Sequence, residues 1–297
     1  MVEDASRRTV AVVGAGKVGT AMAGLLASRG YRVVSVFDPL PEAMQGVAAG
    51  SGAAPAPTPG AAASKAAIVL VTTPDDAIAR VCHEIAESGT RLEGKIFIHM
   101  SGALTLSALE PAALAGASVL SVHPLQTFPD AAGATRSLPG SAFGVTCEPG
   151  MEGWAAGFVS DLGGSILMVR DGEKVLYHAA AVIACNVMVM VEHASQWLCD
   201  RLGFEGAEVT GAYMPLVRAT VDNLERLGPS ASLTGPLARG DVGTLRAHLE
   251  ALEPYPELAT LYRAASTWGL RIVTERGEVS AGVVEEMRRL LGQGPAA

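Results

Sequence analysis

Two segments of the chain carry basic side chains of types that move protons. Lys174 and His178 lie four residues apart, so on a helix they share one face at a separation of about 6 Å. An ammonium group near a developing alkoxide stabilises its charge and can donate the proton. His123, which follows an apolar run, could polarise a carbonyl or exchange a proton near neutral pH. The structural alternatives are a solvated helix start for Lys174 and an anchoring hydrogen bond for each histidine.

Two other polar residues could hold a small substrate. Asn186 stands in an otherwise apolar run and needs a partner, which could be substrate, water or another helix. Arg239 lies in a polar segment between two expected helices, and its guanidinium would suit a carboxylate. An ion pair across helices or subunits is the structural alternative for Arg239.

A glycine-rich turn near the start of the chain predicts a phosphate-binding site. The run 9–13 is typical of a β-strand, GAGKVG follows it, and residues with helical spacing come next. The first glycine allows a tight turn, the second lets backbone approach a pyrophosphate, and the third allows close packing of helix on strand. The N-terminus of the helix offers free N–H groups to phosphates. The predicted contacts with a dinucleotide are Gly14, Gly16, Lys17, Val18 and Gly19.

Asp38 ends the second expected strand, 19 residues after Gly19. A carboxylate at this point accepts hydrogen bonds from the adenosine ribose and repels a 2′-phosphate. Pro39 and Leu40 follow, so no adjacent arginine offers a clamp for that phosphate. The pattern favours NAD over NADP, and an ordinary Asp-Pro turn is the alternative.

Two later loops should border the same cofactor. Thr73 and Pro74 follow the fourth expected strand, and Ser101 follows the fifth. Ligands of doubly wound sheets lie beyond the carboxyl ends of the strands. Ser101 could therefore bond the nicotinamide or the substrate, or it could cap the helix expected near Thr105.

Strand and helix patterns alternate through the first half, which predicts an α/β fold with a doubly wound parallel sheet. A weak stretch at 48–67, rich in Ala, Gly, Pro and Ser, falls where a third strand and a short helix belong. The expected strands are Thr9–Val13, Arg32–Phe37, Ile68–Thr72, Ile96–His99, Val119–Val122, Ala142–Thr146 and Ile166–Val169.

From about residue 174 the strand patterns stop and an all-α domain is expected. Lys174–Arg201 predicts one long apolar helix, buried on nearly all sides. The expected domains are a dinucleotide-binding domain at 1–171 and a helical substrate and dimerisation domain at 172–297. The further expected helices are Glu208–Leu227, Asp241–Leu252, Pro256–Gly269 and Ala281–Leu291.

Composition restricts the partners. A net charge of −8 argues against nucleic acid and against an anionic membrane surface. The four cysteines show no metal-ligand spacing, so we expect no metal. The apolar stretch Ala179–Val191 is too short to span a bilayer, and the charged amino terminus lacks a signal-peptide core. A cytoplasmic location is expected.

The segments GAGKVG, TTPDDAI, HMSGAL, SVHPLQTF, YHAAAVIACN and LTGPLARGD occur in this order from about Val10 to Leu261. In this respect the chain resembles a group of Rossmann-like oxidoreductases with a partly uncharacterised C-terminal domain. That group is similar to ketopantoate reductase, some members being described as an alternative type of it, within the 6-phosphogluconate dehydrogenase-like superfamily. SVHPLQTF and LTGPLARGD carry the specific part of the resemblance.

The resemblance implies roles for several residues. Lys174 with His178 resembles the lysine-plus-four arrangement of ketopantoate reductases and β-hydroxyacid dehydrogenases, although the fourth residue there is usually Asn. His123 matches the histidine of prephenate dehydrogenases that contacts the substrate hydroxyl. With Asp38 at the end of its second expected strand, the chain resembles the NAD-using β-hydroxyacid dehydrogenases. Relatives of this architecture commonly pair through the helical domain, so a homodimer is expected.

Together these features predict an NAD(P)-dependent oxidoreductase that reduces a small 2-oxo acid, as ketopantoate reductase does. Lys174 would be the general acid or oxyanion stabiliser, and His123 or His178 the proton partner. Ser101, Asn186 and Arg239 would hold the substrate. The alternatives are a prephenate-like hydroxyacid dehydrogenase or an imine reductase on the same fold, and a nucleotide-binding sensor without turnover.

Overall fold

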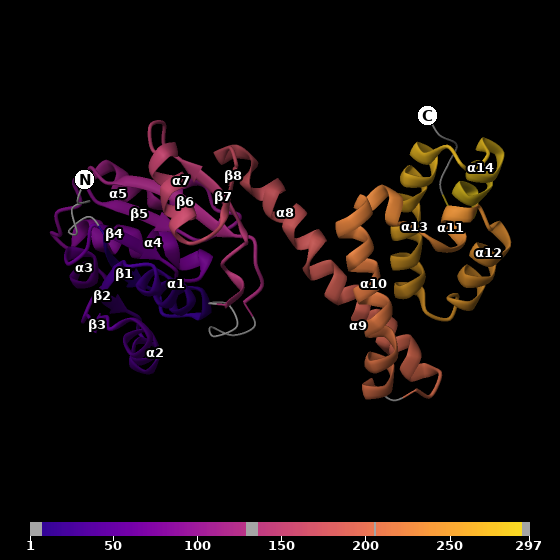
Figure 1. Ribbon diagram of the computed structural model, residues 1–297, viewed down its shortest axis with the longest axis horizontal. Helices are drawn as coiled ribbons and strands as arrows, with labels where there is room; N and C mark the ends of the chain where they lie inside the picture. Colours follow the sequence, from indigo (N-terminus) through magenta and orange to yellow (C-terminus); the bar gives the residue numbers. More distant parts are fainter. Residues whose placement is uncertain (1–7, 129–135, 205, 293–297) are drawn as a thin grey trace. The chain divides into compact units, whose positions relative to one another are not determined.

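The structure is a computed structural model that describes residues 8–128, 136–204 and 206–292 (Figure 1). The chain divides into two compact units, residues 1–186 and 187–297. The sequence places this division after residue 171, whereas contacts place it after Asn186. The difference arises because the helix that starts at Lys174 buries that lysine in the first unit.

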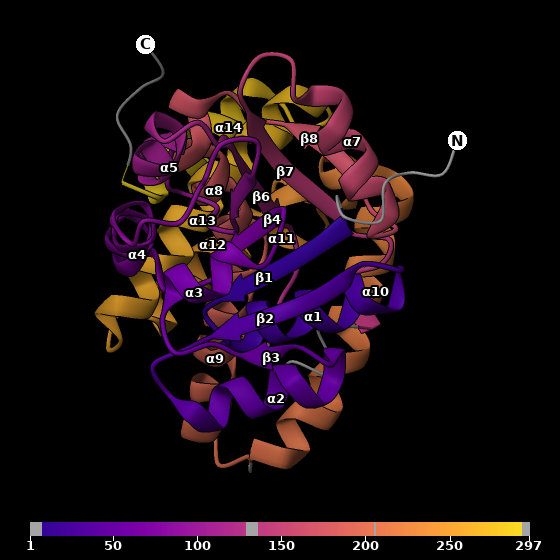
Figure 2. The same cartoon turned by 90° about the vertical axis from the view of Figure 1, so that its left-hand side faces the viewer.

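In the described part of the chain, the first unit contains an eight-stranded sheet with the order β3-β2-β1-β4-β5-β6-β7-β8. Figure 2 shows β1, β2 and β3 side by side at one edge of this sheet. Every expected strand is present, and a two-residue strand occupies the weak stretch at 48–67. The strands are β1 (Thr9–Val13), β2 (Arg32–Phe37), β3 (Ala54–Pro55), β4 (Ile68–Val71), β5 (Ile96–His99), β6 (Ser118–Pro124), β7 (Ala142–Cys147) and β8 (Ser165–Met168).

The last two strands depart from the expected all-parallel sheet. β7 pairs antiparallel with β6, and β8 runs parallel to β7. An antiparallel neighbour needs no helical crossover, so the chain can return directly along β6. The remaining strands are parallel, which brings the carboxyl ends of β1, β4, β5 and β6 to one edge of the sheet.

Helices cover both faces of the sheet, as a doubly wound fold requires. The helical segments of this unit are α1 (Lys17–Ser28), α2 (Pro41–Ser51), α3 (Pro59–Ser64), α4 (Asp75–Glu87), the 3-10 turn η2 (Leu106–Leu109), α5 (Glu110–Leu114), α7 (Glu152–Asp161), the 3-10 turn η3 (Asp171–Glu173) and α8 (Lys174–Ala184). Val10 and Val12 of β1 pack with α1, α2 and α7, whereas Ala11 and Val13 pack with α3, α4 and α5. Alternation along each strand therefore builds two cores.

The second unit is helical. Its helices are α9 (Asn186–Arg201), which starts at the end of the first unit, α10 (Gly206–Ser232), α11 (Gly235–Arg239), α12 (Val242–Ala251), α13 (Pro256–Arg276) and α14 (Ala281–Leu290). Its core lies between α12, α13 and α14, around Leu245, Leu270 and Met287. α10 is broken at Gly228, whose φ of 77° lies outside the helical region, so the first part ends where the sequence predicts, at Leu227.

The prediction of one buried helix over Lys174–Arg201 is wrong on two points. The helix breaks at Cys185 into α8 and α9. Its apolar side chains are also exposed, with Leu176 at 75% and Ile183 at 67%, because no described element packs over them. In α8 the residue that is buried is the charged one, Lys174, at 1% exposure. Apolar character along this segment therefore does not mark the core of either unit.

The same segment is longer than the apolar stretch that was expected to be too short to span a bilayer. That expectation considered Ala179–Val191 alone. Counted from Asp171 to Arg201, the helical segment is long and apolar enough to cross a membrane by length and composition.

Candidate active site

The turn between β1 and α1 uses its glycines for different reasons. Gly14 has φ +104°, and a Cβ there would lie 2.5 Å from the backbone nitrogen of Thr73. A Cβ at Gly19 would lie 2.0 Å from the carbonyl oxygen of Gly14. At Gly16 a Cβ would meet no atom within 4 Å, so this backbone faces open space. The turn is closed against its own strand and loop but open where a ligand would approach.

The N-terminus of α1 suits an anion. Gly16 precedes the helix and offers no side chain to cap it, and the first turn contains no acidic residue. Lys17, the first helical residue, adds a positive charge at the same place. The uncapped N–H groups and the helix dipole together fit a pyrophosphate.

The carboxylate of Asp38 is built into this turn. Oδ2 accepts the backbone N–H of Ala15 at 2.8 Å, and Oδ1 accepts the N–H of Leu40 at 2.9 Å. The strand-end turn that the sequence offered as an alternative is therefore present. Each carboxylate oxygen can accept more than one hydrogen bond, so contact with a ribose hydroxyl remains open to it.

The loop after β4 contains a polar group with no partner. The hydroxyl Oγ1 of Thr73 is buried and has no hydrogen-bond partner within the described residues. Pro74 follows it and precedes α4. Because buried polar groups are almost always paired, this hydroxyl fits a contact with a bound cofactor.

Ser101 is fully engaged by the protein. Its Oγ donates to Oδ2 of Asp75 over 2.7 Å and accepts the backbone N–H groups of Ala103 and Leu104 at 3.2 and 3.0 Å. The residue is also 6% exposed. These bonds order the loop before η2 but do not cap it, since Thr105 is the N-cap of η2, and they leave the hydroxyl little capacity for a substrate.

The side chain of Lys174 contacts the loop that follows β5 and a residue of strand β6. Its Nζ donates to Oγ of Ser121 at 2.6 Å and to the carbonyl oxygen of Ser101 at 3.2 Å. Burial lowers the pKa of Lys174 to about 8, and the nearby carboxylates of Asp171 and Asp75 oppose that shift. The amine is therefore a buried cation that can lose its proton slightly above neutral pH.

His123, near the end of β6, forms a cluster with two residues of α8. Its Nδ1 lies 2.9 Å from the hydroxyl of Tyr177, and its ring meets the His178 ring edge to face at 5.4 Å. Burial, the nearby His178 and the Lys174 charge lower the pKa of His123 to about 4. His123 is therefore neutral at physiological pH and can donate a hydrogen bond from only one of its nitrogens.

An open cavity of about 480 Å³ lies over this cluster. His123, His178, Gln126 and Asn186 supply its polar lining, and Phe128 is among the apolar residues. The structure therefore brings three of the predicted site residues to one cavity. Lys174 is not in that lining, because it is buried against Ser101 and Ser121.

Arg239 belongs to the second unit, where it ends α11. Asp241 lies beside it and caps α12 by accepting the N–H of Thr244 at 3.0 Å. The Arg239 charge contributes to the lowered pKa of Asp241. The hydrogen bonds with Thr244 are the larger causes of that shift, so the structural alternative and a contact of Arg239 with substrate both stay predictions.

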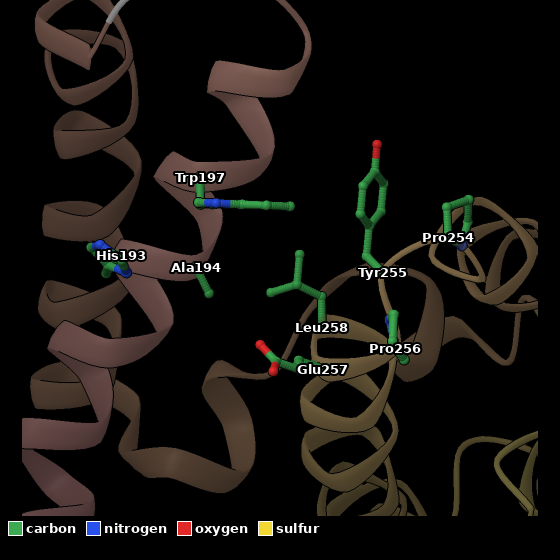
Figure 3. Close-up of a pocket in the computed structure, with 8 residues that line it drawn as sticks. All are labelled: His193, Ala194, Trp197, Pro254, Tyr255, Pro256, Glu257 and Leu258. Atoms are coloured by element: carbon green, nitrogen blue, oxygen red, sulfur yellow. The ribbon is translucent and has the colours of Figure 1, made fainter.

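The second unit has a larger hollow, of about 570 Å³, between α9 and the start of α13 (Figure 3). Trp197, Tyr255 and Leu258 face it, and the two aromatic rings meet nearly at right angles, at 84°. His193 and Glu257 are its ionisable residues. The unit has no phosphate-binding turn, so we place the chemistry at the cavity of the first unit.

Sequence reasoning missed Tyr177, Ser121 and Asp75. Ser121 and His123 are two residues apart on β6, which is a signal that both face one side of the sheet. Tyr177 precedes His178, and its role depends on which way α8 turns against β6. Within the ranges that the structure describes, no three His, Cys, Asp or Glu side chains come together as a metal site would require.

Comparisons with known proteins agree with this architecture. Residues 3–124 match the profile of a Rossmann-like domain, and residues 141–268 match that of a domain of unknown function, DUF2520. No curated protein matches the sequence.

Three solved structures share the fold at low sequence identity. A Bacteroides fragilis protein provisionally named an NADP oxidoreductase has a TM-score of 0.71 at 20% identity, with 89% of this chain and 98% of that chain covered. The reductive aminase of Aspergillus terreus, solved with NADPH and ethyl-5-oxohexanoate, has a TM-score of 0.61 at 19% identity, with coverage of 96% and 92%.

The pyrroline carboxylate reductase of Plasmodium falciparum, solved with NADP, has a TM-score of 0.61 at 13% identity, with coverage of 95% and 97%. These likenesses establish the fold over nearly the whole chain. Residues 3–124 thus match a Rossmann-like domain, residues 141–268 match a DUF2520 domain, and the chain shares the fold of these solved structures.

Proposed function

We propose that the chain is an NAD(P)H-dependent oxidoreductase that reduces a polarised double bond in a small substrate. The observation that supports this most is the position of the His123 cavity. It opens at the carboxyl end of β6, on the edge of the sheet that also carries the glycine turn and the unpaired hydroxyl of Thr73. Doubly wound sheets bind dinucleotides and their substrates at that edge.

The turn formed by Gly14, Gly16, Lys17, Val18 and Gly19 would hold a nicotinamide dinucleotide, which would supply a hydride for the carbon of the double bond. The oxygen or nitrogen of that bond then needs a proton. His123 and His178 line the cavity and are the groups that contact that atom. Lys174 would act as an electrostatic stabiliser, since its ammonium lies in a desolvated network where a charge acts strongly, and as general acid it would pass its proton through a group that lines the cavity.

The proposed substrate is a small 2-oxo acid such as ketopantoate. The support is the sequence resemblance in SVHPLQTF and LTGPLARGD, which supply His123 and Arg239. Asn186 lines the cavity and would bind the substrate. Arg239 would bind the substrate carboxylate. Ser101 would position the substrate indirectly, because its hydroxyl holds the backbone N–H groups of Ala103 and Leu104 in place.

Reduction of a C=N bond is the second candidate. Two of the proteins that share the fold are named reductive aminase and pyrroline carboxylate reductase. The neutral His123 also suits an imine, whose nitrogen needs a hydrogen-bond donor. A prephenate-like hydroxyacid would use the same cavity in the direction of oxidation.

For the cofactor we propose a preference for NAD. Asp38 follows β2, and Glu42 lies in the first turn of α2. Two carboxylates at this place disfavour a 2′-phosphate.

The test is steady-state oxidation of NADH and of NADPH with 2-oxo acids, cyclic imines, and ketone–amine mixtures, followed by loss of dihydronicotinamide absorbance. Turnover of 2-oxo acids alone supports the first candidate, and turnover of imines alone supports the second. Tight cofactor binding without turnover of any substrate contradicts both and supports a nucleotide sensor.

We also propose that the chain is a homodimer in the cytoplasm and that the second unit forms the interface. Large apolar side chains along α9 and α10 are 38% to 63% exposed, among them Val189, Met190 and Leu216. The largest apolar patch of a typical monomer is about 300–600 Å², and longer apolar faces mark an interface. A molar mass near twice 30.4 kDa by light scattering is the expected result. A monomer, or flotation with lipid vesicles, contradicts it.

A further inference from the structure

The Tyr177 hydroxyl is held at a fixed point by the sheet. It lies over Gly144 of β7, the residue paired with His123 across the two strands. A Cβ at position 144 would lie 2.1 Å from the phenol oxygen, so any side chain there would displace Tyr177. A glycine, a strand pair and a helix start therefore place one hydroxyl beside His123.

The surroundings of this hydroxyl decide which atom receives its proton. A neutral phenol has one proton to donate, and a buried O–H group needs an acceptor for it. The phenol keeps its own proton at neutral pH, because burial raises the pKa of Tyr177 to about 12. Nδ1 of His123, 2.9 Å away, is the acceptor within reach of that proton.

Only one tautomer of a neutral His123 is consistent with this contact. A neutral imidazole carries a single proton, on Nδ1 or on Nε2. With Nδ1 accepting from Tyr177, the proton must lie on Nε2. That edge of the ring faces the loop after β5, since a Cβ at Gly102 would lie 2.9 Å from both Cε1 and Nε2. His123 lines the cavity, and no described residue accepts a hydrogen bond from its Nε2.

We propose that Tyr177 is a positioning residue that fixes His123 as the Nε2–H tautomer, so that His123 presents a hydrogen-bond donor to the substrate. The substrate atom is then an acceptor, the oxygen of a C=O bond or the nitrogen of a C=N bond. This rests on the proposed function for the identity of the acceptor, but the tautomer itself does not depend on turnover. The opposite tautomer would present a lone pair to the cavity and repel either acceptor.

The chain contains a matched control. His248 and Tyr262 in the second unit form the same pair, with Nδ1 2.9 Å from the hydroxyl and the rings at 86°. The His248 pair is exposed, whereas the His123 pair is partly buried, so water replaces the tyrosine more readily at His248 than at His123. Tyr262→Phe therefore removes the same hydroxyl without touching the cavity.

The experiment is ¹⁵N NMR of the histidine side chains of the whole, unliganded protein near pH 7. The His123 signals are assigned as those missing in His123→Gln. We expect the Nε2–H tautomer at His123 in the unchanged protein, a mixture of tautomers in Tyr177→Phe, and no change at His123 in Tyr262→Phe. An Nδ1–H tautomer in the unchanged protein, or an unchanged tautomer in Tyr177→Phe, overturns the proposal.

Kinetics give a second measurement once a substrate is known. A histidine in the wrong tautomer costs orders of magnitude in rate, so we expect Tyr177→Phe to lower kcat by about 10²-fold. The Kd of the dinucleotide should stay the same, and Tyr262→Phe should leave both constants unchanged. If no substrate is turned over, the proposed function fails while the NMR result still decides the tautomer.

Discussion

Asp38 holds the glycine turn in place through Ala15, whose backbone N–H it accepts at 2.8 Å. The second carboxylate oxygen accepts the N–H of Leu40 at the start of the next connection. One side chain thus links the end of β2 to the loop between β1 and α1. A residue proposed to select the cofactor is also part of the scaffold that forms the phosphate site, and the two roles need different substitutions.

Asp38→Ala should remove both roles, whereas Asp38→Asn should remove the charge but keep one of the two scaffold hydrogen bonds. The alanine removes two hydrogen bonds, so we expect the free energy of unfolding to fall by about 1–3 kcal/mol and the affinity for both dinucleotides to fall. The asparagine keeps one acceptor oxygen but loses the charge, so the ratio of NADH to NADPH affinity should narrow. Calorimetric titration with both dinucleotides is the measurement. An unchanged ratio in Asp38→Asn would exclude Asp38 from cofactor selection.

Lys174→Met should separate catalysis from folding. A buried ammonium is costly, and methionine replaces its length without a charge. We expect the free energy of unfolding to stay level or rise, the dinucleotide Kd to stay the same, and kcat to fall by about 10²-fold or more. Lys65→Met, at an exposed lysine, is the control and should change none of these. Loss of folding in Lys174→Met would instead make the lysine structural.

The fold was predictable wherever a local pattern decides the structure. Strands buried on both faces are short β-branched runs, and for this reason β1, β2 and β5 begin and end at the predicted residues. The site was less predictable, because its groups come from distant segments. The hydroxyl of Ser101 is directed by Asp75, 26 residues away. The spacing of Lys174 and His178 predicts a shared helix face but not which neighbours that face meets.

The helical segment 171–201 shows a further limit of the sequence. Its apolar composition predicts burial, but composition does not say whether the cover comes from the same chain or from outside it. In the described structure of a single chain, the helix breaks at Cys185 and Leu176 is exposed, so the described residues of the same chain do not cover this segment. Exposed apolar residues and core residues have the same periodicity, so only tertiary contacts distinguish them.

His123 should make the protein sensitive to mild acid. Its folded pKa is about 4, below the value near 6.5 of an unfolded histidine. Between these values the unfolded chain binds a proton that the folded chain does not, so stability falls as the pH falls from 6.5 to 4. Over that window the contribution is about 3 kcal/mol.

The measurement is urea unfolding at pH 7 and at pH 4.5, with and without His123→Asn. His123→Asn should lose most of the pH dependence of the unfolding free energy that His123 causes. His193→Asn, at an exposed histidine, should retain it. His99, whose pKa burial lowers to about 3, contributes in the same direction and stays in both proteins. An equal slope in His123→Asn and in the unchanged protein would show that His123 titrates normally.

Gly102→Ala should disturb the site without disturbing the cofactor turn. The added Cβ would lie 2.4 Å from Nδ1 of His178 and 2.9 Å from Nε2 of His123, so at least one imidazole must move. Displaced reacting groups lower rates steeply, and we expect kcat to fall by about 10²-fold with the dinucleotide Kd unchanged. Gly153→Ala in α7, where a Cβ meets no atom within 4 Å, is the control and should leave kcat unchanged. Full activity in Gly102→Ala would show that the histidine pair tolerates displacement, and that its geometry does not limit the reaction.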